Sequence, residues 1–318
     1  MEEAEGREGR EWVRALGLFG LTLALTVLHP LLLVALPFAI LAVVAPGNRL
    51  AALALAGVVL ALSFAGSPGS GLWYVERAWA LLVGGWFVAL TLAWPEAGFT
   101  GRALGAVAGG VAWSGALFLL WPEGWTVVDW VVSERILQGA ATTLTALGAL
   151  QGTMELPDTL VAAVERTARI QGRVFPALLA LSSLAALGVA WWLYQRLSLG
   201  KEGALGPVSG FRFHDHLIWV LIGGLGLLLL GWEGGWSRVG ENLVLFMGAL
   251  YALRGVAVVV AVSGGASLLG GILAVVALVV AAPMVLAAAF ALGLGDTWLD
   301  LRARWTPGTS DPDANGMT

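Results

Sequence analysis

The chain of 318 residues contains no cysteine and little charge. Without cysteine there is no disulfide, no thiol nucleophile and no cysteine-ligated zinc or iron–sulfur cluster. Only 12% of the residues are charged, roughly half the share in a soluble domain. Most of the surface therefore cannot face water. The net charge of −4 provides no basic patch of the kind that nucleic acid requires, so we expect no nucleic-acid partner.

Motifs of common catalytic and energy-coupling sites are also missing. No glycine-rich loop is followed by Lys-Ser or Lys-Thr, and neither His-Glu-x-x-His nor Gly-x-Ser-x-Gly occurs. We therefore expect no enzyme, no catalytic residues and no cofactor. Any coupling to ATP must come from another subunit.

Hydrophobic residues make up 58% of the chain and gather in runs long enough to cross a bilayer. The sequence predicts an all-α polytopic transmembrane helix bundle of about eight spans. The runs are 16–44, 50–64, 78–94, 103–121, 174–194, 217–231, 243–262 and 268–292. The first run contains Pro30 and Pro37, so it is either one kinked span or a span followed by a re-entrant half-helix.

Basic residues favour the cytoplasmic side of a membrane. With both termini inside and run 16–44 crossing once, eleven basic residues lie inside against five outside. If that run crossed twice, the two sides would be equal. We therefore expect a multi-pass protein of the bacterial cytoplasmic membrane with both termini cytoplasmic. We expect nearly all of the tryptophans to anchor helices at the membrane interface, and we expect no ligand cage from Trp191 and Trp192.

The predicted domain organisation has three parts. A charged cytoplasmic N-terminus covers 1–15, a single transmembrane domain covers 16–305, and a Pro- and Gly-containing disordered tail covers 306–318. The longest segment between spans, near 125–173, lies flat on the bilayer or inside the bundle over its first part. After Pro157 its pattern predicts an amphipathic cytoplasmic helix. That helix either supports the membrane surface or docks a soluble partner.

Arg254 lies near the middle of the predicted span 243–262. A charge there costs about 2.5–3.5 kcal/mol on insertion scales, so it requires an explanation. Tyr251 shares its helical face, while Gly248 and Gly255 keep the helix narrow for close packing. Arg254 therefore either binds an anionic solute or forms a structural ion pair. We predict a ligand-binding site formed by Arg254, Tyr251 and Asn242.

Two further polar segments have sufficient structural explanations. His214 and His216 would point the same way in an extended segment, but no third ligand is near in the sequence, so we expect no metal site. Asp215 between them is expected to cap the helix that follows. Asp296, Asp300 and Arg304 follow one another at intervals of four residues, which predicts a ladder of salt bridges at the end of a helix. The alternative is that the two aspartates form an acid–base pair.

Four segments of the second half carry a family resemblance. They are 211–219, 240–243, 250–255 and 292–302. Together they resemble the YybS-like family of bacterial integral membrane proteins, a domain of unknown function. That family is distantly similar to the substrate-binding membrane subunits of energy-coupling-factor transporters. The resemblance implies a helix bundle that captures a small molecule and works with a partner subunit.

Three functions stay open at this point. The first, which we favour, is a transport-type subunit that binds a small solute within its bundle, and it predicts a closed cavity beside Arg254. The second is a non-transporting membrane scaffold or assembly subunit, which predicts a packed interior with Arg254 ion-paired. The third is an intramembrane enzyme using Asp296, Asp300 or His214, which requires those groups to meet in one cleft. The expected partners are the lipid bilayer, a small-molecule ligand and a membrane-protein subunit.

Overall fold

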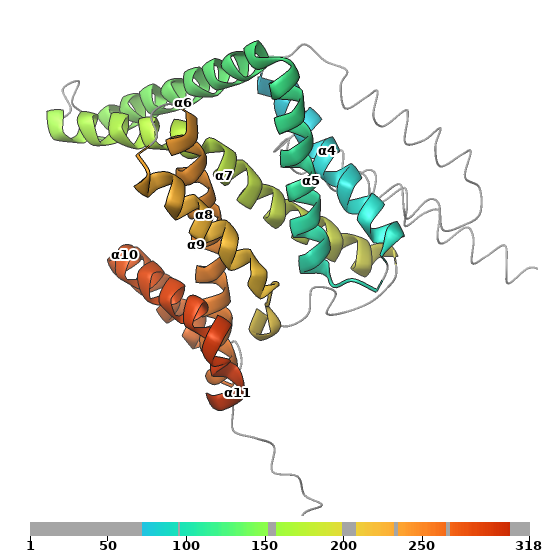
Figure 1. Cartoon of the computed structure of the whole chain (residues 1–318). Helices are drawn as coiled ribbons and strands as arrows, with labels where there is room; N and C mark the ends of the chain where they lie inside the picture. Colours follow the sequence, from blue (N-terminus) through green and yellow to red (C-terminus); the bar gives the residue numbers. More distant parts are fainter. Residues whose placement is uncertain are drawn as a thin grey trace, which may run out of the picture. The chain divides into compact units, whose positions relative to one another are not determined.

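The structure is a computed structural model that describes residues 72–94, 96–151, 157–198, 208–231, 235–264 and 268–305 (Figure 1). The predicted segments 1–15, 16–44, 50–64 and 306–318 lie outside the described residues. Within the described ranges the chain forms α-helices and short 3-10 turns. This confirms the predicted all-α class.

Each predicted span in the described ranges coincides with a helix. These helices are α4 (Leu72–Ala93), α5 (Phe99–Leu120), α7 (Asp158–Ser198), α8 (Ile218–Leu229), α9 (Gly235–Val262) and α10 (Leu268–Leu299). In the described part of the chain, four segments are long and apolar enough to cross a membrane. They are Phe99–Leu120, Asp158–Trp192, Gly235–Val262 and Val276–Leu299. The count of eight spans stays a prediction.

The segment between the fourth and fifth predicted spans is helical throughout its described residues. α6 (Pro122–Gln151) begins with a proline, which suits the first helical position because its missing N–H has no acceptor there. α7 joins the predicted amphipathic helix to the predicted span 174–194 without a break, although Pro176 lies inside it. The expected two elements are therefore one helix of 41 residues.

The described helices fall into two compact units. Unit 1 contains α4 to α7 and residues 235–242 at the start of α9. Its helices α4, α5 and α7 pack together, and α6 packs on α7 (Figure 1). A Cβ on Gly109 would come within 2.7 Å of the Trp86 ring, and one on Gly105 within 3.0 Å of Leu90. The absence of a side chain at these two glycines therefore allows α4 and α5 to pack closely.

Unit 2 contains residues 208–217, α8, α9 from Leu243, α10 and α11 (Leu301–Trp305). The backbones of α9 and α10 touch, because a Cβ on Gly255 would overlap the Ala289 carbonyl and one on Gly293 would overlap the Tyr251 carbonyl. Gly248 has open space where a Cβ would stand, so the packing expected of it is wrong. α10 bends at Ala281, which has non-helical φ and ψ and lies two residues before Pro283.

Candidate functional site

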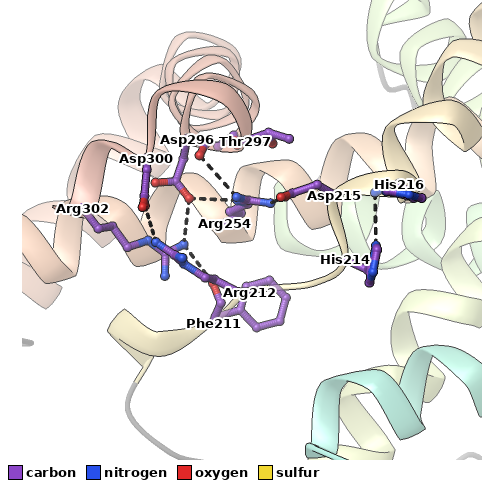
Figure 2. Close-up of polar contacts among 11 residues, drawn as sticks. Phe211, Arg212, His214, Asp215, His216, Arg254, Asp296, Thr297, Asp300 and Arg302 are labelled. Atoms are coloured by element: carbon purple, nitrogen blue, oxygen red, sulfur yellow. Dashed lines mark hydrogen bonds and ion pairs between the residues drawn. The ribbon is translucent and has the colours of Figure 1, made fainter. Parts of the chain in front are cut away.

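A buried charge network centres on Arg254 in α9 (Figure 2). Its Nε donates to Asp296 Oδ2 at 2.9 Å, and its Nη1 donates to Asp215 Oδ1 at 2.7 Å. Its Nη2 donates to the main-chain carbonyl of Asp296 at 3.3 Å. The side chain of Asp215 is 58% exposed, whereas those of Arg254 and Asp296 are 4% and 0% exposed. The network therefore leads from an exposed carboxylate to a fully buried one.

Arg302 in α11 contacts the same buried carboxylate. Its Nη2 lies 3.3 Å from Asp296 Oδ2 and donates to the Phe211 carbonyl at 2.9 Å. Its Nη1 donates to the Ser209 carbonyl at 2.7 Å. Burial lowers the pKa of the Arg302 guanidinium, and the negative charge of Asp296 opposes that shift. Two guanidiniums thus share one oxygen of Asp296.

A turn at Asp300 makes this arrangement possible. Asp300 has a φ of 42°, in the left-handed region that aspartate tolerates better than most residues. It separates α10 from α11, so that Arg302 comes back toward Asp296. The carboxylate of Asp300 pairs with Arg212, and both of these side chains are about half exposed (Figure 2).

Aromatic rings cover the apolar side of the network. The Phe213 ring lies 5.1 Å from that of Tyr251 in a T-shaped arrangement, and Arg254 Cζ lies 5.5 Å from the Phe213 centroid. Phe290 of α10 makes a second T-shaped contact with Tyr251 at 6.1 Å. The rings fix the position of the Arg254 guanidinium and keep it away from water.

Three buried polar atoms of this region have no hydrogen-bond partner in the described part of the chain. They are Tyr251 Oη, Asp296 Oδ1 and Arg302 Nε. The Thr297 side chain lies near the Tyr251 hydroxyl, but the two do not meet in hydrogen-bond geometry. A buried polar group without a partner costs about 1–3 kcal/mol, so the three atoms together require an explanation.

The sequence predicts either a solute contact or an ion pair for Arg254, and the structure gives it two carboxylate partners. The predicted ladder of Asp296, Asp300 and Arg304 is wrong in its pairing, because the turn at Asp300 ends the helix between its members. Asp296 pairs with Arg254 and Arg302 instead. The expectation of ion pairs at the end of this helix is correct.

Asp215 does not cap the following helix as predicted. His214 is the N-cap of the 3-10 turn Asp215–Leu217, and its Nδ1 accepts the His216 N–H at 3.4 Å. This leaves the Asp215 carboxylate for Arg254. The two imidazole rings meet edge to face with centroids 4.7 Å apart (Figure 2). Among the residues that the structure describes, no group of three His, Cys, Asp or Glu side chains is placed to hold a metal ion.

Asn242, the third predicted ligand residue, lies in unit 1 and bonds to the backbone of α7. Its Oδ1 accepts the Ala177 N–H at 2.8 Å, and its Nδ2 donates to the Arg173 carbonyl at 3.0 Å. These groups flank Pro176, which has no N–H and interrupts helical hydrogen bonding. Asn242 thus takes over hydrogen bonds that a helix normally makes with itself.

Arg238, one turn earlier in α9, donates hydrogen bonds to backbone carbonyls of α7 close to Pro176. Pro176 leaves the Gly172 carbonyl without a helical donor, and Arg238 Nη2 donates to it at 2.8 Å. The Nε of Arg238 donates to the Arg173 carbonyl at 3.1 Å. The guanidinium also pairs with Asp129 of α6 and lies 5.2 Å from the Trp125 ring. Its planar array of donors suits several acceptors at once.

Unit 1 also contains a buried arginine that sequence reasoning missed. Arg102, in the first turn of α5, is 8% exposed, and its Cζ lies 4.7 Å from the Trp191 ring centroid and 5.8 Å from that of Phe87. In the part of the chain that the structure describes, its Nε is buried without a hydrogen-bond partner. Cation–π contacts are worth about 2 kcal/mol when desolvated, less than the several kcal/mol that burying a charge costs.

No sequence signal identifies this arrangement, because Phe87, Arg102 and Trp191 are far apart in the chain. Trp191 is only 7% exposed. Its indole ring lies against the guanidinium of Arg102.

Two grooves lie between α6 and α7 in unit 1. One has a volume of about 300 Å³ and includes Asp129, Arg173 and Arg238 in its lining. The other, of about 480 Å³, is lined mainly by small residues such as Gly139, Ala140 and Ala163. Neither groove is lined by Arg254 or Tyr251.

Comparison with known proteins identifies the family. No curated protein and no solved structure matches the chain. Residues 15–297 match the family described as predicted membrane protein (DUF2232), which covers most of the sequence and bears out the resemblance of the later segments. The chain therefore belongs to this family of predicted membrane proteins.

Proposed function

We propose that this membrane protein is a transport-type subunit that binds a small solute within its helix bundle and depends on another subunit for energy. The solute contacts are the Tyr251 hydroxyl and the Asp296 carboxylate, while Arg254 holds Asp296 in place. The observation that supports the proposal is the set of three buried atoms without partners around one charge network. In native proteins such atoms generally bond to an ordered water or a ligand.

The network suggests the class of solute. Asp296 Oδ1 needs a hydrogen-bond donor, whereas the Tyr251 hydroxyl can donate or accept. The charges of the surrounding region balance, since three arginines face three aspartates in ion pairs. A solute with a net charge would disturb that balance. We therefore propose an uncharged or zwitterionic solute with at least one hydroxyl, amide or amine donor.

We leave Asn242 out of the proposed solute site because its amide already has hydrogen-bond partners. Both ends of its amide bond to the backbone of α7 or α9. The proposed site therefore consists of Tyr251, Arg254 and Asp296, where the sequence predicts Arg254, Tyr251 and Asn242. Arg254 acts by positioning, because its Nε, Nη1 and Nη2 already donate to Asp215 and Asp296.

Mass spectrometry of small molecules that co-purify with the detergent-solubilised protein tests the proposal. We expect about one solute per chain in the wild type and a clear loss in Tyr251→Phe, which removes only the hydroxyl that lacks a partner. Thr145→Val is the matched control, because it removes an exposed hydroxyl that bonds only within α6. A wild type that carries no solute in a mild detergent, or a Tyr251→Phe protein that retains it, would contradict the proposal.

The alternative is a non-transporting scaffold or assembly subunit. It is favoured by the ion pairing of Arg254 and by the backbone contact of α9 with α10 at Gly255 and Gly293. In that case the network only stabilises unit 2. A protein without a solute, whose Tyr251→Phe variant unfolds at the same temperature or higher, would support this role.

A further inference from the structure

We propose that Arg102 forms an anion-binding site at the start of α5, for a ligand that carries a phosphate or carboxylate group. The site lies in unit 1 and shares no residue with the proposed solute site, whose residues belong to unit 2. Arg102 is more than nine-tenths buried, yet its described contacts are with aromatic rings and its Nε has no hydrogen-bond partner. Among the described residues no carboxylate pairs with this buried guanidinium, so an anion could supply the opposite charge.

The start of α5 offers a second group of donors. Gly98 is the N-cap and makes no side-chain hydrogen bond, so the N–H groups of Phe99, Thr100 and Gly101 have no acceptor within the helix. The Arg102 N–H donates to the Gly98 carbonyl at 3.3 Å, which closes the first turn. A Cβ on Gly98 or Gly101 would meet nothing within 4 Å, so there is open space beside these donors. The positive end of the helix dipole favours an anion there.

The aromatic rings define where the guanidinium can lie. The centroid of the Phe87 ring lies 5.8 Å from that of Trp191 and 5.8 Å from that of Phe99. The rings that contact Arg102 thus extend to Phe99, the first residue of α5. Helical side chains lean toward the N-terminus, which directs Arg102 toward the free N–H groups of its own first turn. The ring faces attract the guanidinium but carry no formal negative charge, so they compensate its charge only in part. An anionic oxygen at this position would accept hydrogen bonds from both the Arg102 guanidinium and the backbone N–H groups of the first turn of α5.

The ligand class follows from the single uncompensated charge. One guanidinium with a helix N-terminus suits a monoanionic or dianionic oxygen group, such as a phosphate or a carboxylate. The phosphate of a lipid headgroup and a soluble phosphate present the same chemistry. The two sources are distinguished by experiment.

The test uses the full-length protein in an uncharged detergent. In the first arm, sodium phosphate is added at constant ionic strength and the melting temperature is recorded. In the second arm, native mass spectrometry counts the phosphatidylglycerol retained after release from nanodiscs of phosphatidylcholine with and without that lipid. The variants are Arg102→Met, Arg102→Lys and the control Arg166→Met, which removes an exposed arginine of α7.

We expect the wild type and Arg166→Met to show a saturable rise in melting temperature, retention of about one phosphatidylglycerol, or both. A response to phosphate alone identifies a soluble anion, and retention of the lipid alone identifies a headgroup. Arg102→Met should lose the response, and Arg102→Lys should bind about tenfold more weakly because it cannot offer a planar pair of donors. A wild type without either response, or an Arg102→Met protein that keeps it, overturns the proposal.

Protein stability provides a second, independent measurement. Because no carboxylate pairs with Arg102 in the described residues, Arg102→Met should melt at the same temperature as the wild type, or higher, in buffer without added anion. A lower melting temperature or a failure to fold would show that Arg102 has a structural counter-charge, and the anion site would then be wrong. The solute test on Tyr251 is unaffected by either result.

Discussion

Asn242 of α9 makes the hydrogen bonds that Pro176 disturbs in α7. Its Oδ1 accepts the Ala177 N–H at 2.8 Å, and its Nδ2 donates to the Arg173 carbonyl at 3.0 Å. The amide has the donor and acceptor geometry of a peptide group, so it can replace a missing turn of helical bonding. A proline that would weaken a helix of 41 residues is thereby tolerated.

The pairing of Asn242 with Pro176 predicts strong coupling between two substitutions. Asn242→Ala should lower the free energy of unfolding by about 1–3 kcal/mol, because it leaves the N–H of the buried Ala177 without its acceptor, whereas the Arg173 carbonyl keeps Arg238 as a donor. In the Pro176→Ala background the same change should cost clearly less, since alanine restores the N–H to α7. A double-mutant cycle measured in mixed micelles gives the coupling.

Gln138→Ala is the control for that cycle, because it removes an exposed amide that bonds only to Glu134 of its own helix. It should change stability little and show no coupling to Pro176. Equal losses for Asn242→Ala in both backgrounds would show that the amide does not act through the proline.

Arg238→Lys should destabilise unit 1 although the charge is kept. Arg238 bonds to two backbone carbonyls and to Asp129 while it lies against Trp125, and an ammonium cannot reach all of them at once. We expect a loss of about 1–3 kcal/mol, measured by chemical unfolding. Arg166→Lys, on the exposed face of α7, should be neutral; an equal effect of the two substitutions would contradict the role given to Arg238.

Asp→Asn substitutions at positions 296 and 300 compare the stability contribution of a buried carboxylate with that of an exposed one. Asp296→Asn leaves Arg254 and Arg302 facing a neutral amide in a buried site, and should cost about 3–5 kcal/mol. Asp300→Asn removes one member of an exposed pair and should cost about 0–1 kcal/mol. Thermal unfolding of the two variants side by side measures the difference, and similar melting temperatures would be inconsistent with the network.

Glycine substitutions test the contact of α9 with α10. Gly255→Ala and Gly293→Ala each place a methyl group on a backbone carbonyl of the facing helix, so both should unfold at markedly lower temperature. Gly248→Ala meets open space and should raise stability by about 0.5–1 kcal/mol, since alanine favours the helix. If all three variants melted alike, the close contact would not exist in solution.

Hydropathy predicts the helical class and the described apolar helices well, because a bilayer imposes one length and one composition on each span. It places Pro176 inside the predicted span 174–194, but it does not predict that this span forms one continuous helix with the amphipathic segment before it. That outcome depends on Arg238 and Asn242, which lie more than 60 residues further along the chain. The local sequence pattern therefore predicts two elements where side chains distant in the sequence allow one continuous helix.

The sequence predicts only part of the candidate site, because some of its contacts join residues that are distant in the chain. Arg254 is recognisable because a charge interrupts an apolar run, and Tyr251 follows from helical spacing. Asp296 was assigned to the wrong partners, because the turn at Asp300 cannot be read from a four-residue spacing. Arg102 was missed because it lies at the edge of a predicted span, where arginine is ordinary, and only the fold brings Phe87 and Trp191 around it.

The hydrogen bonds from Arg238 and Asn242 of α9 to the backbone of α7 have a consequence for biosynthesis. A ribosome makes Pro176 long before Arg238 and Asn242, which lie 65 residues or more beyond their acceptors. While the intervening chain is being made, α7 has exposed carbonyls that only the next part of the protein can satisfy. Truncation before residue 238 should therefore leave a nascent helix that quality-control proteases can recognise, whereas extension past residue 242 should protect it.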